Sequence, residues 1–317
     1  MIEVTSLEEC IFHAERFDKI IVDISYGTEY LFFNYNPLGL GNLLTGFLGA
    51  TAVSDRTSKK HIIPVFKTRI HALSRDILSW IARSSFAVSN FQIILDRAKY
   101  SNSAFGKDIS YIDTAKRVLH LSTHLVNVDP SYLLTIKNSL RGSHDQELYS
   151  AFGISITRKN SDTIWDNKSL SIGLHIRRGD FKVKPVKIDN FEHNFSPDIV
   201  FFTDIIRRFK IGSIKTVTIY SDQSDLDTRK MLLDYFPKDF DYRIFGSIKK
   251  SSVVLNDMMK NDLLVHCNST LSNWSSILSG QIAIYPWDRT PLFANRIFDN
   301  FFDVEELNQV LKRLNME

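Results

Sequence analysis

Two neighbouring arginines form the pattern in this sequence that points most clearly to chemistry. Arg177 and Arg178 lie in the segment His175-Ile176-Arg177-Arg178-Gly179-Asp180, directly after an apolar run that begins at Leu170. Arginines are costly on a buried strand, and α/β proteins bind ligands outside the carboxyl ends of their strands. Planar guanidinium groups match phosphate oxygens. The segment therefore predicts a phosphate-binding site, and the alternative is a surface pair that forms salt bridges with Asp180.

A pair of glycines precedes the first long helical pattern. The segment Gly39-Leu40-Gly41-Asn42 separates a strand-like run from apolar residues spaced for a helix that starts near Leu43. The backbone N–H groups of Gly41 and Asn42 can approach a phosphate there, at the positive end of the helix. The alternative is a tight turn between a strand and a helix.

A serine and an aspartate follow a second strand-like run, Thr216–Tyr220. The Asp222 carboxylate can accept two hydrogen bonds, from a ribose diol or from guanine N–H groups, and Ser221 lies beside it. The same residues would also suit the N-cap of the next helix.

Hydroxyl side chains cluster at the start of a later helix. Ser269, Thr270 and Ser272 follow a strand-like run that ends at Cys267. One hydroxyl is enough to cap a helix. Three in four residues indicate that some of them donate to a phosphate as well.

Composition excludes several classes of protein. The chain has 317 residues, 44% of them hydrophobic, and its 39 basic and 36 acidic residues give a net charge of +3, which does not suit a nucleic-acid-binding protein. Cys10 and Cys267 cannot build a disulfide framework or a cysteine-rich metal site, which favours a reducing compartment. We find no zinc-binding H-E-x-x-H, no phosphate-binding Walker A segment and no G-x-S-x-G elbow.

The amino terminus lacks the basic and apolar regions of a signal peptide, and no apolar run approaches the roughly 20 residues of a membrane span. We therefore expect a cytoplasmic protein, with peripheral association at the cytoplasmic face of the membrane as the alternative.

The second half of the chain predicts a doubly wound α/β domain. Short β-rich runs alternate there with amphipathic helical ones, as in repeated βαβ units. The expected strands are Leu170–Ile176, Thr216–Tyr220, Asp241–Phe245, Leu263–Cys267 and Ile282–Tyr285, and the expected helices are Asp198–Lys210, Leu226–Tyr235, Ser252–Lys260, Leu271–Leu278 and Val304–Leu314.

The first half also begins as an α/β pattern. Strands are expected at Ile20–Ile24, Tyr30–Phe33 and Ile62–Phe66, where Pro64 predicts an edge position, and helices at Leu43–Asp55 and Arg69–Arg83. The polar stretch Thr157–Asp162 predicts a linker. We therefore expect two domains, residues 1–156 and residues 157–317.

Taken in order, the Gly39 to Asn42 segment, His175-x-Arg177-Arg178-x-Asp180, Ser221-Asp222 and the Asn268 to Trp274 segment resemble the fucosyltransferase superfamily. The greatest similarity is to bacterial α-1,2-fucosyltransferases, and α-1,6-fucosyltransferases are more distant. This resemblance implies a glycosyltransferase B (GT-B) fold of two Rossmann-like domains, with the acceptor on the amino-terminal half and GDP-fucose on the other. It also implies inversion at the sugar, with no bound metal and no other cofactor.

The resemblance also implies roles for single residues. Arg178, with Arg177, would stabilise the departing GDP as Mg²⁺ does elsewhere, helped by the Gly41-Asn42 backbone and the hydroxyls of Ser269 and Thr270. His175 and an acidic residue would contact the guanosine. The chain offers Asn256 and Asp257 for the acidic position, slightly out of the family's register.

Inversion requires a base that takes the proton of the acceptor hydroxyl. The segment from Glu192 to Pro197 resembles the Glu-x-x-Phe-x-Pro of the α-1,6 branch, which makes Glu192 the candidate base. Asp180 and His193 are alternatives, and Glu192 would otherwise be a solvated loop carboxylate.

The expected activity is transfer of fucose from GDP-fucose to a bacterial surface glycan, such as a lipopolysaccharide or capsule precursor, in α-1,2 linkage. One alternative is the same fold with another nucleotide sugar. Another is an inactive GDP-sugar-binding protein that has kept the arginines and lost the base.

Overall fold

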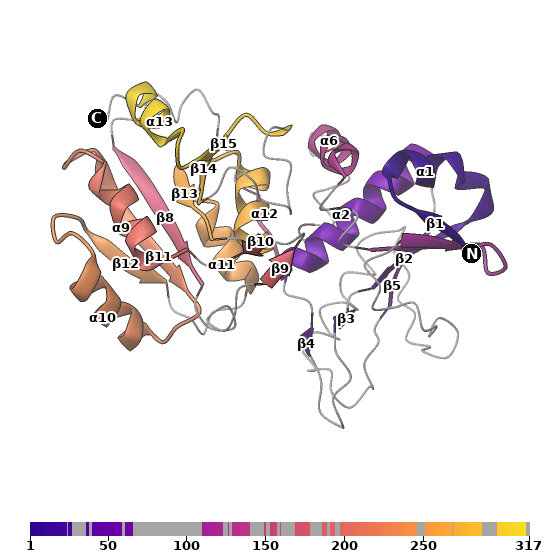
Figure 1. Ribbon diagram of the computed structural model, residues 1–317, viewed down its shortest axis with the longest axis horizontal. Coiled ribbons are helices and arrows are strands. Elements are labelled where there is room, and N and C mark those ends of the chain that lie inside the picture. Colours follow the sequence, from indigo (N-terminus) through magenta and orange to yellow (C-terminus); the bar gives the residue numbers. More distant parts are fainter. Residues whose placement is uncertain are drawn as a thin grey trace. The chain divides into compact units, whose positions relative to one another are not determined.

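The computed structural model divides the chain into two compact units (Figure 1). Unit 1 comprises Met1–Ile154 with Pro291–Ile297, and unit 2 comprises Ser155–Thr290 with Phe298–Glu317. The structure describes residues 1–23, 25–26, 36–37, 40–58, 61–65, 110–122, 126, 129–139, 149, 153–156, 159, 169–177, 186–188, 191–193, 197–245, 251–267, 269–286 and 297–314.

Unit 1 is built on a mixed five-stranded sheet in the order β1-β6-β7-β2-β5. Strand β2 is parallel to its neighbours β7 and β5, whereas β6 is antiparallel to both β1 and β7. Pro64 lies in β5 at the edge of this sheet, as predicted, because a residue without an N–H group cannot donate to a strand on both sides. The strands are β1 (Ile2–Val4), β2 (Lys19–Asp23), β5 (His61–Val65), β6 (Ser110–Asp113) and β7 (Val118–Leu121).

Helix α2 is the longest described element of unit 1. It extends from Leu40 to Thr57, contains the predicted helix Leu43–Asp55, and packs on α6, on β2 and on α1. Its Gly49 permits a close contact, since a Cβ atom there would lie 2.3 Å from a methyl group of Val126. The other elements are α1 (Leu7–Phe12), the 3₁₀ turn Ala14–Arg16, β3 (Ser25–Tyr26), β4 (Asn36–Pro37) and α6 (Pro130–Ser139). The expected strand Tyr30–Phe33 and helix Arg69–Arg83 lie outside the described residues.

Unit 2 contains a six-stranded sheet in which all described pairings are parallel. The spatial order is β12-β11-β8-β13-β14-β15, so the six strands follow the order 3-2-1-4-5-6 by position in the chain. This is the doubly wound arrangement that binds nucleotides where the winding reverses, here between β8 and β13. The strands are β8 (Leu170–Ile176), β11 (Ile214–Ser221), β12 (Tyr242–Phe245), β13 (Leu263–Val265), β14 (Ile282–Tyr285) and β15 (Phe301–Asp303).

Helices cover both faces of this sheet because its strands have apolar residues on both sides. On one face Leu170, Ile172, Leu174 and Ile176 of β8 pack in one core with residues of α9, α10 and α13. On the other face Tyr220 and Leu264 pack with Met258 at the end of α11. The helices are α9 (Ile199–Arg207), α10 (Asp225–Tyr235), α11 (Ser251–Met258), α12 (Thr270–Ser279) and α13 (Leu307–Arg313), and a hairpin of β9 (Val186–Ile188) and β10 (Phe191–His193) lies between β8 and α9 in the chain.

The two units together give the mixed α/β class with parallel strands that the sequence predicts. Each strand and helix expected in the second half is found, with ends shifted by a few residues. The elements that were not predicted are the strands β1, β3, β4, β6, β7, β9, β10 and β15 and the helices α1 and α6.

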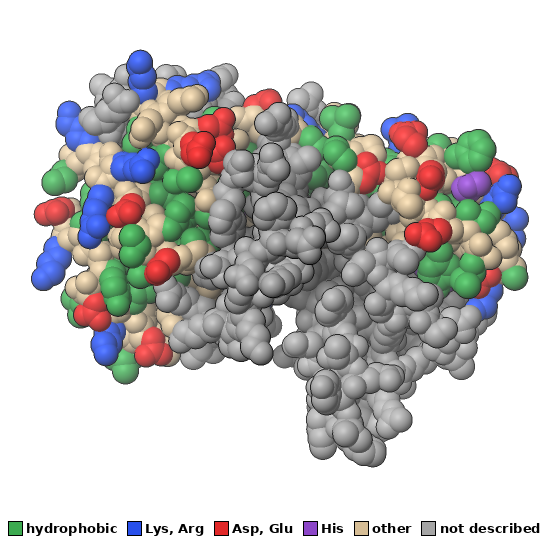
Figure 2. Space-filling model, in the orientation of Figure 1, with side chains coloured by type: hydrophobic (Ala, Val, Ile, Leu, Met, Phe, Trp, Pro, Cys, Tyr) green, Lys and Arg blue, Asp and Glu red, His purple; other side chains and the backbone are tan. Residues whose placement is uncertain are grey.

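No helix among the described residues is both long and apolar enough to cross a membrane. Figure 2 shows acidic and basic side chains interspersed over the described surface of one face. An anion on that surface would therefore be held by a local group of residues rather than by a broad basic face.

Candidate functional site

The carboxyl ends of three neighbouring strands meet at the point where the winding of unit 2 reverses. In the register of the sheet, Ile176 of β8 pairs with Ser221 of β11, and Leu174 pairs with Val265 of β13. The residues that follow these strand ends are Arg177, Asp222 and the segment that leads into α12. The structure therefore brings together four of the predicted groups, His175-Arg177, Ser221-Asp222, Ser269 and Thr270, at one end of the sheet.

His175 is a buried histidine at this end of the sheet. It is only 7% exposed, and its Nδ1 atom lies 3.4 Å from the sulfur of Cys267. Burial, with a further contribution from the positive charge of Arg177, lowers the pKa of His175 to about 3. The ring is therefore neutral at physiological pH and carries one donor and one acceptor nitrogen, as a contact to a nucleoside requires.

Cys267 connects the ends of β8 and β13. The thiol is fully buried, and burial raises its pKa to about 12 against the opposing effects of the Arg177 charge and of a hydrogen bond from the Arg177 backbone N–H. The charge of Asp222 also acts on this thiol. Arg177 and Asp222 are thus both within electrostatic range of one buried sulfur. Arg178, Gly179 and Asp180 lie outside the described residues.

The amino terminus of α12 follows β13 at the same end of the sheet. Ser269 is the N-cap residue with extended backbone angles, yet its side chain makes no capping hydrogen bond. The first-turn N–H groups of a helix have no partner within the helix, so they form a positive end that can bind an anion. Thr270 begins the helix and is partly exposed.

Ser272 has a different role in the structure from its neighbours. It is fully buried, and its hydroxyl donates to the backbone carbonyl of Ser269 at 3.0 Å. A hydroxyl has only one proton, and that of Ser272 is donated to this carbonyl. Ser272 therefore stabilises the turn before α12.

A buried polar network lies behind this turn, and the sequence did not predict it. The two ring nitrogens of His266 lie 3.1 Å from Oδ1 of Asn273 and 2.9 Å from Oγ of Ser276. The ring also stacks on Tyr285, whose hydroxyl donates to the same Asn273 oxygen at 2.8 Å. Burial is the main cause that lowers the pKa of His266 to about 3. Such a network fixes the strand-to-helix turn that ends at Ser269.

The predicted acidic contact to guanosine is not at this end of the sheet. Asp257 lies in the last turn of α11, where its carboxylate accepts hydrogen bonds from the Tyr220 hydroxyl at 2.9 Å and from Arg243 at 3.2 Å. The last turn of α11 leads toward the amino end of β13, the opposite end from the nucleotide crevice of such a sheet. Asn256 instead accepts a hydrogen bond from the backbone N–H of Ser155.

Gly41 and Asn42 lie in the first turn of α2 in unit 1, because this helix begins at Leu40 rather than near Leu43, as predicted. Their N–H groups are among those that have no partner within the helix. Gly41 is buried, and its carbonyl accepts a hydrogen bond from Thr45 at 3.0 Å.

Glu192 lies in strand β10, opposite Lys187 of β9, rather than in a loop. His193 follows it, opposite Val186. Across the described part of the chain, no group of three or more His, Cys, Asp and Glu side chains could hold a metal ion.

Two solved structures are similar to this chain at 11% identity. E. coli heptosyltransferase WaaC with ADP matches over 93% of this chain and 97% of its own, with a TM-score of 0.37. A glycosyl transferase family 9 protein from Veillonella parvula matches over 95% of this chain and 92% of its own, with a TM-score of 0.39. No curated protein sequence matches the chain. The sequence pattern of a family described as Glycosyl transferase family 11 matches residues 106–296, well over half of the chain.

Proposed function

The chain belongs to glycosyl transferase family 11, the fucosyltransferase family, and we propose that it transfers fucose from GDP-fucose to a hydroxyl of a bacterial surface glycan, in α-1,2 linkage. The observation that supports this proposal most strongly is the convergence of His175, Arg177, Asp222 and the start of α12 at the reversal point of a doubly wound sheet. These are the groups that a nucleoside diphosphate requires: a base contact, a cation, a carboxylate and a positive helix end.

In the proposed complex the guanosine lies near the carboxyl ends of β8 and β11. The neutral imidazole of His175 contacts the base or ribose, and the exposed Asp222 carboxylate accepts hydrogen bonds from the ribose diol or from guanine N–H groups. Asp222 takes the acidic role in this proposal because Asp257 is engaged with Tyr220 and Arg243 in another part of the unit.

The diphosphate lies against the start of α12. Arg177 and Arg178 supply the positive charge, and the first-turn N–H groups with the Ser269 and Thr270 hydroxyls supply further donors. These groups stabilise the negative charge that accumulates on the β-phosphate, so the reaction is proposed to proceed without a bound metal.

The reaction is one displacement at the anomeric carbon. The acceptor oxygen forms a bond to that carbon, the bond from the carbon to the β-phosphate oxygen breaks, and its electron pair leaves with GDP. Glu192 takes the proton of the acceptor hydroxyl, and the anomeric configuration inverts. Asp180 and His193 are the alternative bases.

The experiment that tests this proposal measures GDP release from GDP-fucose with EDTA present, with and without oligosaccharides that end in galactose. Acceptor-dependent GDP release together with a fucosylated product supports the proposal. Release from GDP-mannose or UDP-glucose, and not from GDP-fucose, would assign another nucleotide sugar. Tight GDP binding without turnover on any acceptor would identify an inactive binding protein.

A further inference from the structure

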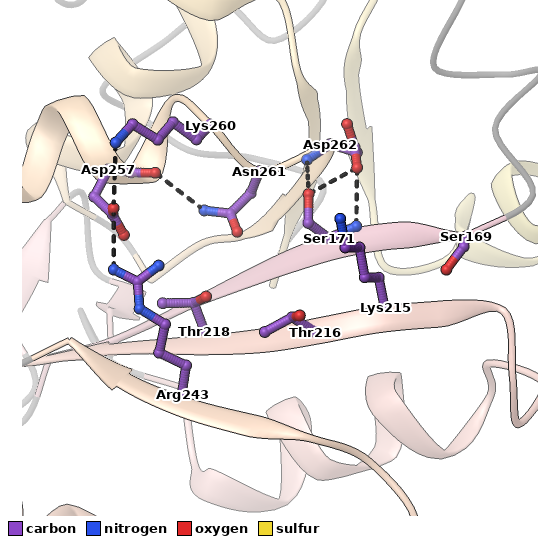
Figure 3. A pocket seen from close by; sticks show the side chains of 10 residues that line it. All are labelled: Ser169, Ser171, Lys215, Thr216, Thr218, Arg243, Asp257, Lys260, Asn261 and Asp262. Carbon is purple, nitrogen blue, oxygen red and sulfur yellow. Dashed lines mark hydrogen bonds and ion pairs between the residues drawn. The ribbon is translucent and has the colours of Figure 1, made fainter.

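Unit 2 contains a second pocket, nearer the amino ends of its strands and thus away from the proposed nucleotide site. Its volume is about 500 Å³, and it is lined by the first halves of β8 and β11, by β12 and by the residues that join α11 to β13. Figure 3 shows these side chains around one space, with Thr216 and Thr218 on β11, and with Arg243 and Lys260 on the side of Asp257. Every residue that lines the pocket is polar or charged.

The two carboxylates of this pocket are already neutralised. Asp257 lies 3.2 Å from Arg243 and 3.8 Å from Lys260, and it also accepts the hydrogen bond from Tyr220. Asp262 lies 2.5 Å from Lys159 and accepts hydrogen bonds from the Ser171 backbone and hydroxyl. Neither carboxylate is therefore left to balance a further cation.

The pocket contains more basic side chains than its two carboxylates can neutralise. Lys215 lines it and has no ionic partner among the residues that the structure describes. Arg243 has five N–H donors, and its described hydrogen bonding is a single bond, to Asp257. A pocket with this surplus favours an anion, because a bound anion removes the repulsion among the cations that surround it.

The hydroxyls of Thr216 and Thr218 indicate where such an anion would lie. Thr216 and Thr218 are on the side of β11 that faces the pocket, and Thr218 is only 3% exposed. Within the described part of the chain, neither hydroxyl has a hydrogen-bond partner. Neither hydroxyl is among the described side-chain atoms that are fully buried without a partner, so both are open to the pocket. A ligand in the pocket can therefore accept their protons in place of water.

We propose that this pocket binds a phosphate monoester through Lys215, Arg243 and the hydroxyls of Thr216 and Thr218. Its oxygens accept the hydroxyl and guanidinium protons, and Lys215 supplies the unpaired charge. The phosphate can come from free phosphate or from a phosphorylated sugar, for which the amide of Asn261 and the Asp257 carboxylate at the pocket wall offer further contacts. This site is separate from the nucleotide site and does not depend on the proposed activity.

The test is calorimetric titration of the full chain with inorganic phosphate, glucose 6-phosphate and glucose. We expect the two phosphate probes to bind and glucose to bind at least tenfold more weakly. Lys215→Gln and Thr218→Val should each weaken the binding by about tenfold, the effect of losing one charge-assisted or buried hydrogen bond. Binding of glucose 6-phosphate with no response to phosphate would identify the sugar phosphate as the ligand, and equal binding of both would identify the phosphate group alone.

Two control variants separate this site from the nucleotide site. Lys230→Gln removes an exposed lysine of α10 outside the pocket and should change nothing. Arg177→Ala should weaken GDP binding and leave this phosphate binding intact, whereas Lys215→Gln should do the reverse. The proposal is overturned if no phosphate probe binds, if glucose binds as well as its phosphate, or if Lys215→Gln binds like the wild type. Should Thr218→Val fail to fold, Lys215→Gln decides alone.

Discussion

The imidazole Nδ1 of His175 lies 3.4 Å from the buried sulfur of Cys267, across the point where the winding of the second sheet reverses. This contact joins the end of β8, which continues into the arginine pair, to the end of β13, which continues into α12. Two strand ends that would carry opposite sides of a nucleotide site are thereby held together by one buried pair.

Removing the Cys267 side chain should loosen this connection. We expect Cys267→Ala to lower the free energy of unfolding by about 1–2 kcal/mol and to weaken GDP binding several-fold, because a fully buried group is lost. Chemical denaturation and GDP titration measure the two effects. The control is Cys10→Ala, which removes the buried cysteine of unit 1 and should lower stability while leaving GDP affinity unchanged. Equal GDP affinity in both variants would contradict a connection between Cys267 and the nucleotide site.

Buried histidines should make the fold acid-sensitive. Burial lowers the pKa of His175 and His266 to about 3 from an ordinary value of 6.5, so between these values the unfolded chain binds protons that the folded chain does not. The free energy of unfolding should therefore be highest above pH 6.5 and fall as the pH falls toward 3, by up to about 1.4 kcal/mol per pH unit for each histidine.

Urea unfolding at pH 7.5 and pH 5 measures this loss. His266→Gln should show a smaller difference between the two pH values than the wild type, and His13→Gln, which alters a partly exposed histidine, should keep the wild-type difference. The same difference in all three proteins would rule out a contribution from His266.

Arg178 should contribute mainly to the transition state. Arg178→Ala should lower kcat/KM by about 10²- to 10³-fold, because a donor aimed at developing charge has this effect in other enzymes. Arg178→Lys should restore little of the activity, since an ammonium group lacks the planar fork that matches phosphate oxygens. Steady-state kinetics with GDP-fucose measure both variants. Near-normal turnover in Arg178→Ala would remove the phosphate role from this residue.

Glu192→Gln should abolish turnover without changing the affinity for GDP-fucose, because the amide keeps the shape of the carboxylate and cannot accept the proton. Lys187→Gln is the matched control, since Lys187 is the register partner of Glu192 in the β9–β10 hairpin. Binding and turnover are measured on the same preparations. Retained turnover in Glu192→Gln would transfer the role of base to Asp180 or His193.

Substitutions of Asp257 and Asp222, the two candidate acidic contacts to guanosine, should have different effects on stability and on GDP affinity. Asp257→Asn should lower the free energy of unfolding by about 1–3 kcal/mol, because Arg243 and Lys260 lose a buried counter-charge, and should leave GDP affinity nearly unchanged. Asp222→Asn should weaken GDP binding with little effect on stability, because Asp222 is exposed. The reverse pattern would restore Asp257 as the guanosine contact.

The doubly wound half could be predicted because its strands are buried on both faces. Leu170–Ile176 and Ile282–Tyr285 are short continuous apolar runs, and both were predicted with the observed ends. The βαβ alternation also predicts a doubly wound sheet with its ligand site at the carboxyl ends of the strands, which explains why residues after three different strands meet.

The features of the fold and of the site that were not predicted depend on information that the local sequence pattern does not contain. Strands β6 and β7 have four residues each, and His120 interrupts the apolar pattern of β7. We expected Asp257 to contact guanosine because of its place in the chain, whereas its contacts depend on its position in the last turn of α11. The His266 network could have been suspected, because Asn273 and Ser276 are three residues apart on one face of an otherwise buried helix.

Calorimetric titration with GDP, GDP-fucose, GDP-mannose and UDP-glucose in the presence of EDTA tests the central claim most directly. The proposed site predicts that GDP and GDP-fucose bind without metal, more tightly than the other two nucleotide sugars, and that Arg177→Ala weakens both. Binding of no guanosine nucleotide under these conditions, or equal binding in Arg177→Ala, would contradict a metal-independent GDP-fucose site at the reversal point of the second sheet.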